Sequence, residues 1–539
     1  MKKLHLLFIG VLSMSTVYAQ DISDAIRFSQ DEIQGSARFR ALSGAFGALG
    51  GDMSAVSLNP AGSAVFSRSH ASFSLSNKDT ENKTQYFNGM NNSSDSNFDI
   101  NQGGAAFVFA SNTNSSWRKF TIAVAYERTN DYDSNWRASG VNTDNDPNFN
   151  NSIASYFYDF ANGLEKFVFT PSGQELVNYF NINNSQAQND PELYFDNNPQ
   201  LYNDLAYEFL GNVEGFSTQQ AFLGFQGYLF SPDSDADNNT DYTSNIAPGS
   251  FDHDYIYTST GYNGKITFNM ATQYEDNLYL GLNLNSHFIN YDRSTLLFED
   301  NSNPGSIVNS VEFENGISTR GSGFSFQLGG ILKLTNEFRV GLTYDSPTWY
   351  TIEEETTQYL ATVRDEGSGL ETQVINPNVI NIHPQYRLQT PAKLAGSLAY
   401  VFGKLGLISF DYSRKDYSQT KFRPTSDAFF ADQNNVMNNI LTDAATYRLG
   451  GEYKHKQLSF RGGYRFEESP YIDGVIVGDL TGYSLGIGYN FGNTKLDITY
   501  DRSERSFVNS FYNLRFDTPA SATVDRTNSN ITLSLSFNI

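Results

Sequence analysis

Strict alternation of apolar and polar side chains is the feature of this sequence that most constrains its fold. Between Asn277 and Leu284 the chain reads Asn-Leu-Tyr-Leu-Gly-Leu-Asn-Leu, and similar segments recur up to the final residue. Successive side chains of a β-strand face opposite sides of a sheet, so each of these segments has one apolar face. Repeated around a closed sheet, such faces are suited to contact with lipid.

The membrane-spanning element of this chain must be a strand. After the first twenty residues no segment approaches the roughly 18 consecutive apolar residues that a spanning helix needs. Every backbone polar group in the hydrocarbon layer must find a partner within the protein, which leaves a closed barrel as the spanning structure. We therefore predict an all-β fold, an antiparallel transmembrane β-barrel.

Short connections between the alternating segments, such as 275–276 and 403–404, predict the topology. Bacterial barrels have short periplasmic turns and longer extracellular loops, so counting outward from these turns gives about 14 strands with both termini in the periplasm. The predicted strands lie near residues 71–77, 102–111, 119–129, 262–274, 277–298, 308–334, 337–350, 385–402, 405–416, 444–455, 457–467, 481–491, 494–504 and 527–539.

The final strand alternates up to the carboxylate. One face carries Ile531, Leu533, Leu535, Phe537 and Ile539, and the other face carries Thr, Ser and Asn. A terminal amphipathic strand of this kind suits recognition by barrel-insertion machinery, although an ordinary closing strand has the same pattern.

Residues 1–19 have the features of a signal peptide. Lys2 and Lys3 precede an apolar run over residues 4–12, and small residues precede Gln20. The cysteine count is zero, which excludes disulfides, thiolate metal sites and a lipid-anchored cysteine. We predict export to the outer membrane of a bacterium of the Gram-negative type.

The composition indicates two kinds of surface. A net charge of -23 fits acidic loops in water, and 33 Tyr with 43 Phe fit aromatic belts at the lipid boundary. The expected partner is therefore outer-membrane lipid, and an acidic surface of this kind does not favour nucleic acid.

Between the third and fourth predicted strands lies a large extracellular insertion, residues 130–261, far longer than usual connections. Residues 152–169 and 201–210 have the pattern of amphipathic helices with aromatic faces. Two interpretations stay open: these helices form a lid over an apolar entrance, or they bury their aromatic side chains against the rim of the barrel.

Before the barrel, which we place at residues 70–539, some fifty residues do not alternate. Gly44, Gly47, Gly50 and Gly51 permit tight turns and close packing. They are followed by Asn59-Pro60-Ala61, where Pro60 forces Asn59 out of helical geometry. We predict a small compact unit over residues 20–69.

This arrangement resembles the FadL/TodX family of outer-membrane transporters for hydrophobic compounds, most closely over residues 35–75. The resemblance implies that residues 20–69 fold into the barrel as a plug, or hatch, which Asn59, Pro60 and Ala61 hold in place. It also implies passive, hatch-gated uptake of compounds such as long-chain fatty acids or aromatic hydrocarbons. No ligand-binding residue is carried over from the family.

Charged residues on the lumen faces of the later strands do not suit an alkyl chain moving straight along the axis. We expect them to pack against the plug in a hydrogen-bonded network. They are Arg448, Glu452, Lys454, Arg461, Arg465, Asp497 and Asp501.

Two weaker signals bear on metals and cofactors. Asp233, Asp235 and Asp237 sit at alternate positions, as in a calcium loop, but Asn238 and Ser244 replace the usual Gly and Glu, which favours a solvated acidic loop. The six histidines are scattered, and we expect them at the surface or rim rather than on a cofactor.

The sequence has no nucleophile elbow, zinc-binding His-Glu-x-x-His or phosphate-binding glycine loop, so we do not expect an enzyme. Besides the hydrophobic-compound channel, two other functions stay open. One is a porin for polar solutes, and the other is a surface adhesion or structural barrel.

Overall fold

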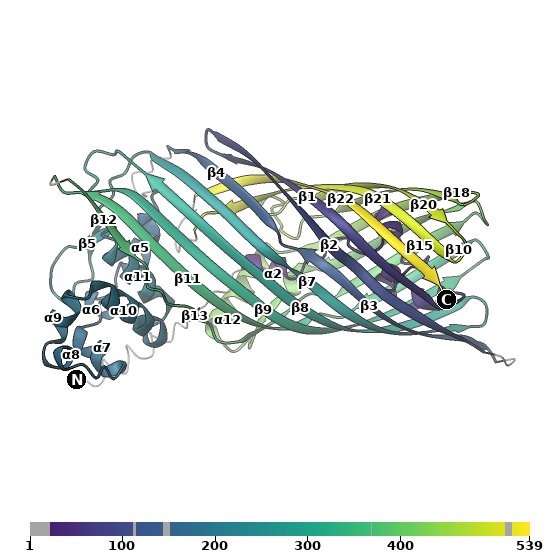
Figure 1. Ribbon diagram of the computed structural model, residues 1–539, viewed down its shortest axis with the longest axis horizontal. Coiled ribbons are helices and arrows are strands. Elements are labelled where there is room, and N and C mark those ends of the chain that lie inside the picture. Colours follow the sequence, from purple (N-terminus) through teal and green to yellow (C-terminus); the bar gives the residue numbers. More distant parts are fainter. Residues whose placement is uncertain (1–21, 112–114, 144–150, 368, 513–519) are drawn as a thin grey trace.

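The chain folds into one long barrel of tilted strands with helices inside it and at one end (Figure 1). The computed structural model describes residues 22–111, 115–143, 151–367, 369–512 and 520–539. The predicted antiparallel β-barrel is confirmed, with 14 wall strands. The predicted signal peptide, residues 1–19, lies outside the described residues.

Some of the 14 wall strands are interrupted and therefore carry more than one label. In chain order they are β1 (His70–Tyr86), β2 (Gly89–Ala110), β3 and β4 (Trp117–Asp131, Ser134–Asn142), β7 (Phe251–Tyr274), β8 (Leu278–Asp300), β9 (Val308–Lys333), β10 and β11 (Phe338–Asp345, Trp349–Asp365), β12 to β15 (Leu370–Ile375, Asn381–Ile382, Tyr386–Gln389, Lys393–Val401), β16 (Gly406–Asp416), β18 (Asp443–His455), β19 (Leu458–Glu467), β20 (Leu480–Asn490), β21 (Thr494–Ser510) and β22 (Ser521–Asn538).

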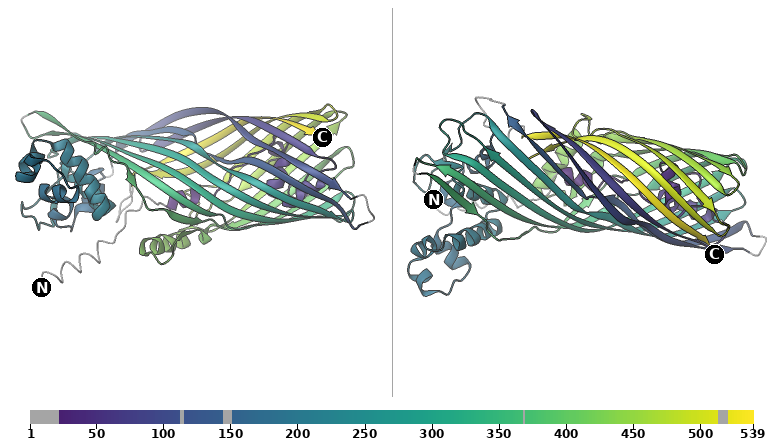
Figure 2. Two further views of the ribbon diagram at one scale, coloured as in Figure 1. Left: turned by 60° about the horizontal axis from the view of Figure 1, so that its bottom comes forward. Right: turned by 45° about the horizontal axis from the view of Figure 1, so that its top comes forward.

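The first and last wall strands close the barrel. β1 pairs with β22 in antiparallel register from His70↔Asn538 to Gln85↔Thr523. The short turns lie at the same end of the barrel as the carboxyl terminus, and the long connections lie at the other end (Figures 1 and 2). This asymmetry identifies the end with the carboxyl terminus as periplasmic.

Strand lengths near the amino terminus differ from the prediction. A loop was expected over residues 78–101, but β1 continues to Tyr86 and β2 begins at Gly89, so this expectation is wrong. The segment is rich in Asn, Ser, Asp and Thr on both faces, because it lies beyond the lipid. A strand without an apolar face cannot be recognised from alternating hydrophobicity.

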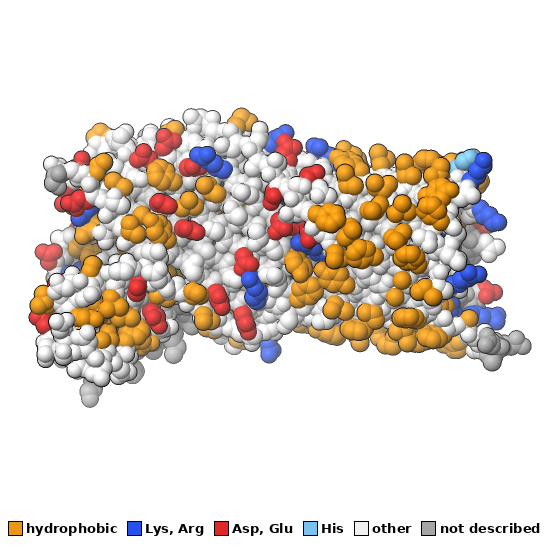
Figure 3. Space-filling model, viewed as in Figure 1, with side chains coloured by type: hydrophobic (Ala, Val, Ile, Leu, Met, Phe, Trp, Pro, Cys, Tyr) orange, Lys and Arg blue, Asp and Glu red, His pale blue; other side chains and the backbone are white. Residues whose placement is uncertain are grey.

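The lipid-facing belt covers only the periplasmic half of the barrel. Figure 3 shows apolar side chains gathered there, whereas charged side chains are scattered over the other half. On β8, Leu280 is 41% exposed and its neighbour Tyr279 only 3%, as the alternation predicts. β9 has 26 residues, while about 9 to 11 tilted residues cross a bilayer, so the barrel extends well beyond the membrane on the extracellular side.

The insertion between β3 and β7 is largely helical. Its helices are α5 (Ala154–Ala161), α6 (Lys166–Phe169), α7 (Gly173–Tyr179), α8 (Ser185–Asn189), α9 (Pro191–Asp196), α10 (Pro199–Val213) and α11 (Phe216–Gln226), with a small hairpin of β5 (Phe230–Pro232) and β6 (Tyr242–Ser244). Both predicted helical segments are therefore helical. The insertion is shorter than the predicted range 130–261, because β4 and the start of β7 fall within that range and belong to the barrel sheet.

The aromatic faces of these helices pack on the barrel rim. Phe157 of α5 contacts Phe313 of β9 with ring centroids 5.0 Å apart, and the same core includes Leu360 and Val524 of the wall. Helices α7 to α10 extend past the barrel mouth (Figures 1 and 2). In the described part of the chain, no helix is both long and apolar enough to cross a membrane.

The N-terminal segment lies inside the barrel as four short helices. These are α2 (Ile22–Arg27), α3 (Ala37–Ala41), α4 (Met53–Leu58) and the 3₁₀ helix η1 (Pro60–Val65). Side-chain caps fix where α3, α4 and η1 begin. The side chains of Ser36, Asp52 and Asn59 accept hydrogen bonds from the backbone amides of Phe39, Ser54 and Ala61, respectively. A last helix, α12 (Ala428–Ile440), follows η2 (Tyr417–Gln419) and β17 (Lys421–Arg423) in the connection from β16 to β18.

The position of the lipid belt can be tested with a matched pair of substitutions. Ile487→Arg places a charge on the belt face of β20 and should lower the free energy of unfolding by about 2–4 kcal/mol. Phe98→Arg, in the β1–β2 hairpin beyond the belt, should have little effect although Phe98 is the more exposed, at 68% against 48%. Urea unfolding in lipid vesicles measures both, and equal losses would contradict the placement.

Candidate functional site

Asn59 lies at the centre of the plug and joins three parts of the molecule. Its side-chain amide donates to the carbonyl oxygens of Gly47 (2.7 Å) and of Gly330 on β9 (3.2 Å). Its carbonyl oxygen accepts from the backbone of Ala61 at 3.1 Å, which starts η1 at Pro60. One buried side chain therefore holds the glycine-rich loop, the 3₁₀ helix and the wall together.

The glycines predicted to matter occupy positions where a side chain is strained or has no room. Gly44, Gly50 and Gly51 have positive φ angles of 74°, 60° and 69°. Gly47 packs against the wall, where a Cβ on Gly341 of β10 would lie 2.4 Å from the Gly47 carbonyl oxygen. The wall and the plug thus approach each other backbone to backbone.

Polar wall side chains bind the plug backbone on several sides. Asp411 of β16 accepts from the amides of Phe46 and Gly47, both at 2.9 Å. The donors to plug carbonyl oxygens are Asn269 to Pro60 (2.9 Å), Asn283 to Val56 (2.8 Å), Gln327 to Ser57 (3.0 Å), Arg339 to Leu49 (3.2 Å) and Thr499 to Ala37 (2.5 Å). We call residues 35–66 the lower plug, and these bonds fix it to the wall.

The lumen-facing charges form the expected network with the plug. Arg38 pairs with Glu452 at 3.0 Å, and Arg40 pairs with Asp501 at 2.7 Å. Arg461 bridges Glu452 and Asp497 at 2.6 Å each. The others lie nearby: Lys454 is 3.1 Å from Glu452, Arg465 is 3.7 Å from Glu467, and Arg448 lies beside Gly44.

Above the lower plug the lumen contains a cavity of about 950 Å³. Aromatic side chains of the wall and of α5 form much of its lining, and Trp136 stacks on Tyr257 with centroids 5.0 Å apart. The aromatic lining consists of Tyr132, Trp136, Tyr156, Phe160, Phe216, Tyr255, Tyr257, Tyr291, Phe313, Phe429, Tyr471, Phe507, Phe511 and Tyr512. The first residues of the chain that are described, in α2, form another part of the cavity surface.

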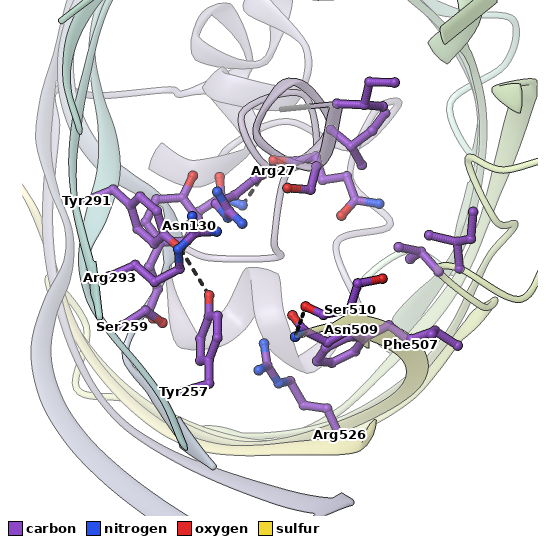
Figure 4. A pocket seen from close by; sticks show the side chains of 18 of the residues that line it. Arg27, Asn130, Tyr257, Ser259, Tyr291, Arg293, Phe507, Asn509, Ser510 and Arg526 are labelled. Atoms are coloured by element: carbon purple, nitrogen blue, oxygen red, sulfur yellow. Dashed lines mark hydrogen bonds between the residues drawn. The ribbon is translucent and has the colours of Figure 1, made fainter. Parts of the chain in front are cut away.

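One side of the cavity is polar (Figure 4). The hydroxyl groups of Tyr257 and Tyr291 are 3.0 Å apart, and the Arg27 guanidinium lies over the Tyr291 ring at 4.5 Å. Arg526 of β22 donates to Asn82 (2.9 Å) and Ser134 (2.8 Å), both neutral. No carboxylate oxygen of the described residues lies within 4.0 Å of the Arg526 nitrogens.

The sequence pattern did not identify these cavity residues. Tyr257 and Arg526 are about 270 positions apart along the chain and meet only because the barrel closes. Both lie on extensions of strands that the alternation placed too short, since it began the last strand at residue 527. The one sequence signal for the cavity was Arg526 itself, which directly precedes the predicted last strand and would face inward if that strand were longer.

The wall has a discontinuity beside the cavity. Backbone pairing of β2 with β3 ends at Gln102↔Glu127, and β4 then pairs with β7 alone. Beyond that point, side chains of β2 bond to β4 and to the residue before it: Ser93 donates to the Asn135 carbonyl oxygen (2.8 Å), and Asn97 donates to the Asp133 carboxylate (2.6 Å). Asn130 and Asp131, at the inner side of this seam, line the cavity.

The calcium-loop residues are not brought together as a ligand set. Asp233 accepts from Thr243 at 2.7 Å, and Asp237 is 4.0 Å from Lys166. In the described part of the chain the one group of three acidic residues with ligand atoms within 4.8 Å of each other is Asp99, Asp131 and Asp133, at the seam.

The expected location of the histidines at the surface or rim is wrong for His383, which is 4% exposed and lines the cavity, and for His253. The His253 side chain is fully buried among aromatic residues, where it contacts Tyr86 (2.6 Å) and Glu299 (2.7 Å). The strand that carries His253 lies under the extracellular helices, so its inward face is buried by the insertion.

The role of Asn59 in fixing the plug can be measured. Asn59→Ala removes two donors and one acceptor and leaves buried carbonyl groups without those partners, so the free energy of unfolding should fall by about 1–3 kcal/mol. Asn183→Ala, at an exposed position without a positive φ angle, should change it little. Equal unfolding midpoints for the Asn59 variant and the unchanged protein would contradict this role.

Comparisons with known proteins agree with this architecture. A family model for outer membrane protein transport proteins (OMPP1/FadL/TodX) matches residues 234–538, more than half of the chain. The fold is similar to that of a Pseudomonas aeruginosa FadL homologue (TM-score 0.50, 11% identity, 94% of this chain and 99% of that chain covered). The Pseudomonas putida toluene transporter TodX gives a TM-score of 0.49 at 13% identity, with 94% and 99% covered. No curated protein sequence matches. The chain belongs to the OMPP1/FadL/TodX family of outer membrane transport proteins.

Proposed function

We propose that this outer-membrane channel takes up hydrophobic compounds with an acidic head group, and that long-chain fatty acids are its substrates. The observation that carries the proposal is Arg526, which faces an aromatic cavity and is hydrogen-bonded there only to neutral groups. An arginine binds a carboxylate well because its planar N–H groups match the two oxygens. Such a ligand would place its head at Arg526 and Tyr257.

The rest of the cavity suits the tail of the same ligand. Burying each CH₂ group is worth about 0.8 kcal/mol, and the aromatic side chains offer an apolar surface for it. A neutral aromatic hydrocarbon would gain from the same surface but would leave the arginine without a counter-charge. This difference favours a fatty acid over a hydrocarbon.

We propose that the gate is the N-terminal arm, residues 22–34, and not the lower plug. The arm has fewer polar contacts with the wall than the lower plug has: the Glu32 backbone amide donates to the Thr129 carbonyl oxygen at 3.0 Å, and Asn130 donates to the Gln30 carbonyl oxygen at 3.0 Å. Two ion pairs join Lys78 to Glu32 (3.4 Å) and Lys415 to Asp31 (3.6 Å), and Lys415 also donates to the Ser29 carbonyl oxygen. Phe28 packs edge-on against Tyr132 and Tyr291. A ligand leaving the cavity towards the seam would displace this arm, while Asn59 keeps the lower plug in place.

The two other functions make different demands. A porin for polar solutes needs an open lumen, but the lower plug and its ion pairs occupy the lumen below the cavity. An adhesion or structural barrel needs no cavity beneath its extracellular helices. Uptake and conductance measurements distinguish all three.

Substrate uptake tests the head-group site. In cells that lack their own fatty-acid transporter, Arg526→Gln should lower the uptake of labelled oleate about tenfold, as expected for one charge-assisted hydrogen bond. Uptake of a neutral hydrocarbon of similar size should change little. Arg502→Gln is the matched control, because Arg502 is on the outward face of β21 and pairs with Glu504 at 2.9 Å.

Two results would count against this account. If the Arg526 variant, inserted at the same level, takes up oleate as fast as the unchanged protein, the head-group site is wrong. If neither oleate nor the hydrocarbon enters cells through the inserted, unchanged protein, uptake of these compounds is not its function.

Conductance in planar bilayers tests the gate. The double variant Lys78→Gln/Lys415→Gln removes both ion pairs of the arm and should open more often than the unchanged protein. Lys404→Gln, in an exposed periplasmic turn, should behave like the unchanged protein. A double variant that is as closed as the unchanged protein would show that the arm is not the gate.

A further inference from the structure

Three cations project together from the outer wall of the barrel. Arg387 of β14 lies directly opposite Arg423 of β17 in antiparallel register, and Lys421 lies opposite Gln389. The pair between them, Leu388 and Phe422, is buried, so the flanking side chains point to the outside. We call Arg387, Lys421 and Arg423 the basic triplet.

Like charges directly opposite each other destabilise a strand pair unless an anion lies between them. Among the described residues no carboxylate oxygen is within 4.0 Å of a triplet nitrogen, and Arg423 donates only to Gln389, at 2.8 and 3.1 Å. Other outward arginines do pair with acids: Arg137 with Asp254 (2.5 Å), Arg320 with Asp292 (2.9 Å), Arg414 with Asp443 (2.5 Å) and Arg502 with Glu504 (2.9 Å).

The carboxylates near the triplet have other partners. Glu353 of the neighbouring β11 accepts from Gln385 at 2.9 Å. The Asp416 carboxylate accepts from the backbone amide of Ser418 and caps η2, and the Asp427 carboxylate accepts from the backbone amide of Phe430 and caps α12. In a chain of net charge -23, a group of cations that acids leave unneutralised indicates an anion from outside the protein.

The triplet lies beside exposed apolar side chains of the wall. Gln389 pairs in register with Trp349, and Trp349 pairs with Phe324, so all three share the outer face. Trp349 is 43% exposed and Phe324 is 47% exposed, and Leu394, at the start of β15, is 55% exposed. An exposed tryptophan between apolar and charged side chains is typical of the membrane interface. The long connections on this side place that interface at the outer leaflet.

We propose that the basic triplet binds the phosphate of a phosphorylated glycolipid in the outer leaflet. The phosphate lies between Arg387 and Arg423 and contacts Lys421, and the acyl chains lie along Trp349, Phe324 and Leu394. Arginine pairs are suited to phosphate because each can donate two N–H bonds to it. This binding concerns the outer wall and is independent of the cavity and of transport.

Native mass spectrometry of the purified full chain with bis-phosphorylated lipid A tests the proposal. Each removed cation should weaken binding about fivefold, so Arg387→Gln/Lys421→Gln/Arg423→Gln should lose about a hundredfold in affinity. Lipid A without phosphates should bind the unchanged protein as weakly as the phosphorylated lipid binds the triple variant. Arg320→Gln is the control, because it removes an outward arginine that already has an acid partner.

Separate measurements exclude misfolding and free phosphate as explanations. Without lipid, the triple variant should unfold at a temperature no lower than that of the unchanged protein, because it loses opposed like charges. Arg387→Lys/Arg423→Lys keeps the charges and should bind the lipid more tightly than the triple variant does. Excess inorganic phosphate should not displace the lipid. The proposal is wrong if the triple variant binds like the unchanged protein, if Arg320→Gln loses as much, if phosphates on the lipid make no difference, or if inorganic phosphate competes fully.

Discussion

Closure of the sheet between β1 and β22 is the constraint on which the rest of the structure depends. In hydrocarbon an unpaired backbone group costs several kcal/mol, so an open edge at the level of the lipid belt is not tolerated. The register from His70↔Asn538 to Gln85↔Thr523 removes that edge and brings the two ends of the chain to one seam. The wall is instead interrupted between β2 and β4, which have no backbone pairing with each other. This interruption begins where the β2–β3 ladder ends, at Gln102↔Glu127.

The closed wall has an outer and an inner face with different tasks. Outside, exposed apolar side chains such as Leu280 and Ile487 meet lipid. Inside, neutral and acidic side chains such as Asn283 and Asp411 bind the backbone of the plug. Because a packed plug with satisfied hydrogen bonds does not deform gradually, movement is confined to elements with few ties. Residues 22–34 are therefore the proposed gate, and the aromatic cavity lies above the lower plug.

Prediction from sequence succeeded where a segment has one apolar and one polar face. It found the strands of the lipid belt and the helical segments of the insertion. It failed for residues 78–101, where the β1–β2 hairpin carries polar side chains on its buried face as well as on its exposed face. It also missed Tyr257, Arg526 and the basic triplet, since nothing in the local sequence marks an arginine whose neighbours come from distant strands.

The sequence by itself determined the barrel, its strand number and its orientation, because each of these follows from side-chain periodicity or turn length. Only the tertiary structure decided where the cavity lies, which arginines lack an acidic partner and where the wall ladder is interrupted. These properties depend on register and closure. Residues such as Asn82, Ser134 and Arg526 become neighbours only after every strand between them has paired.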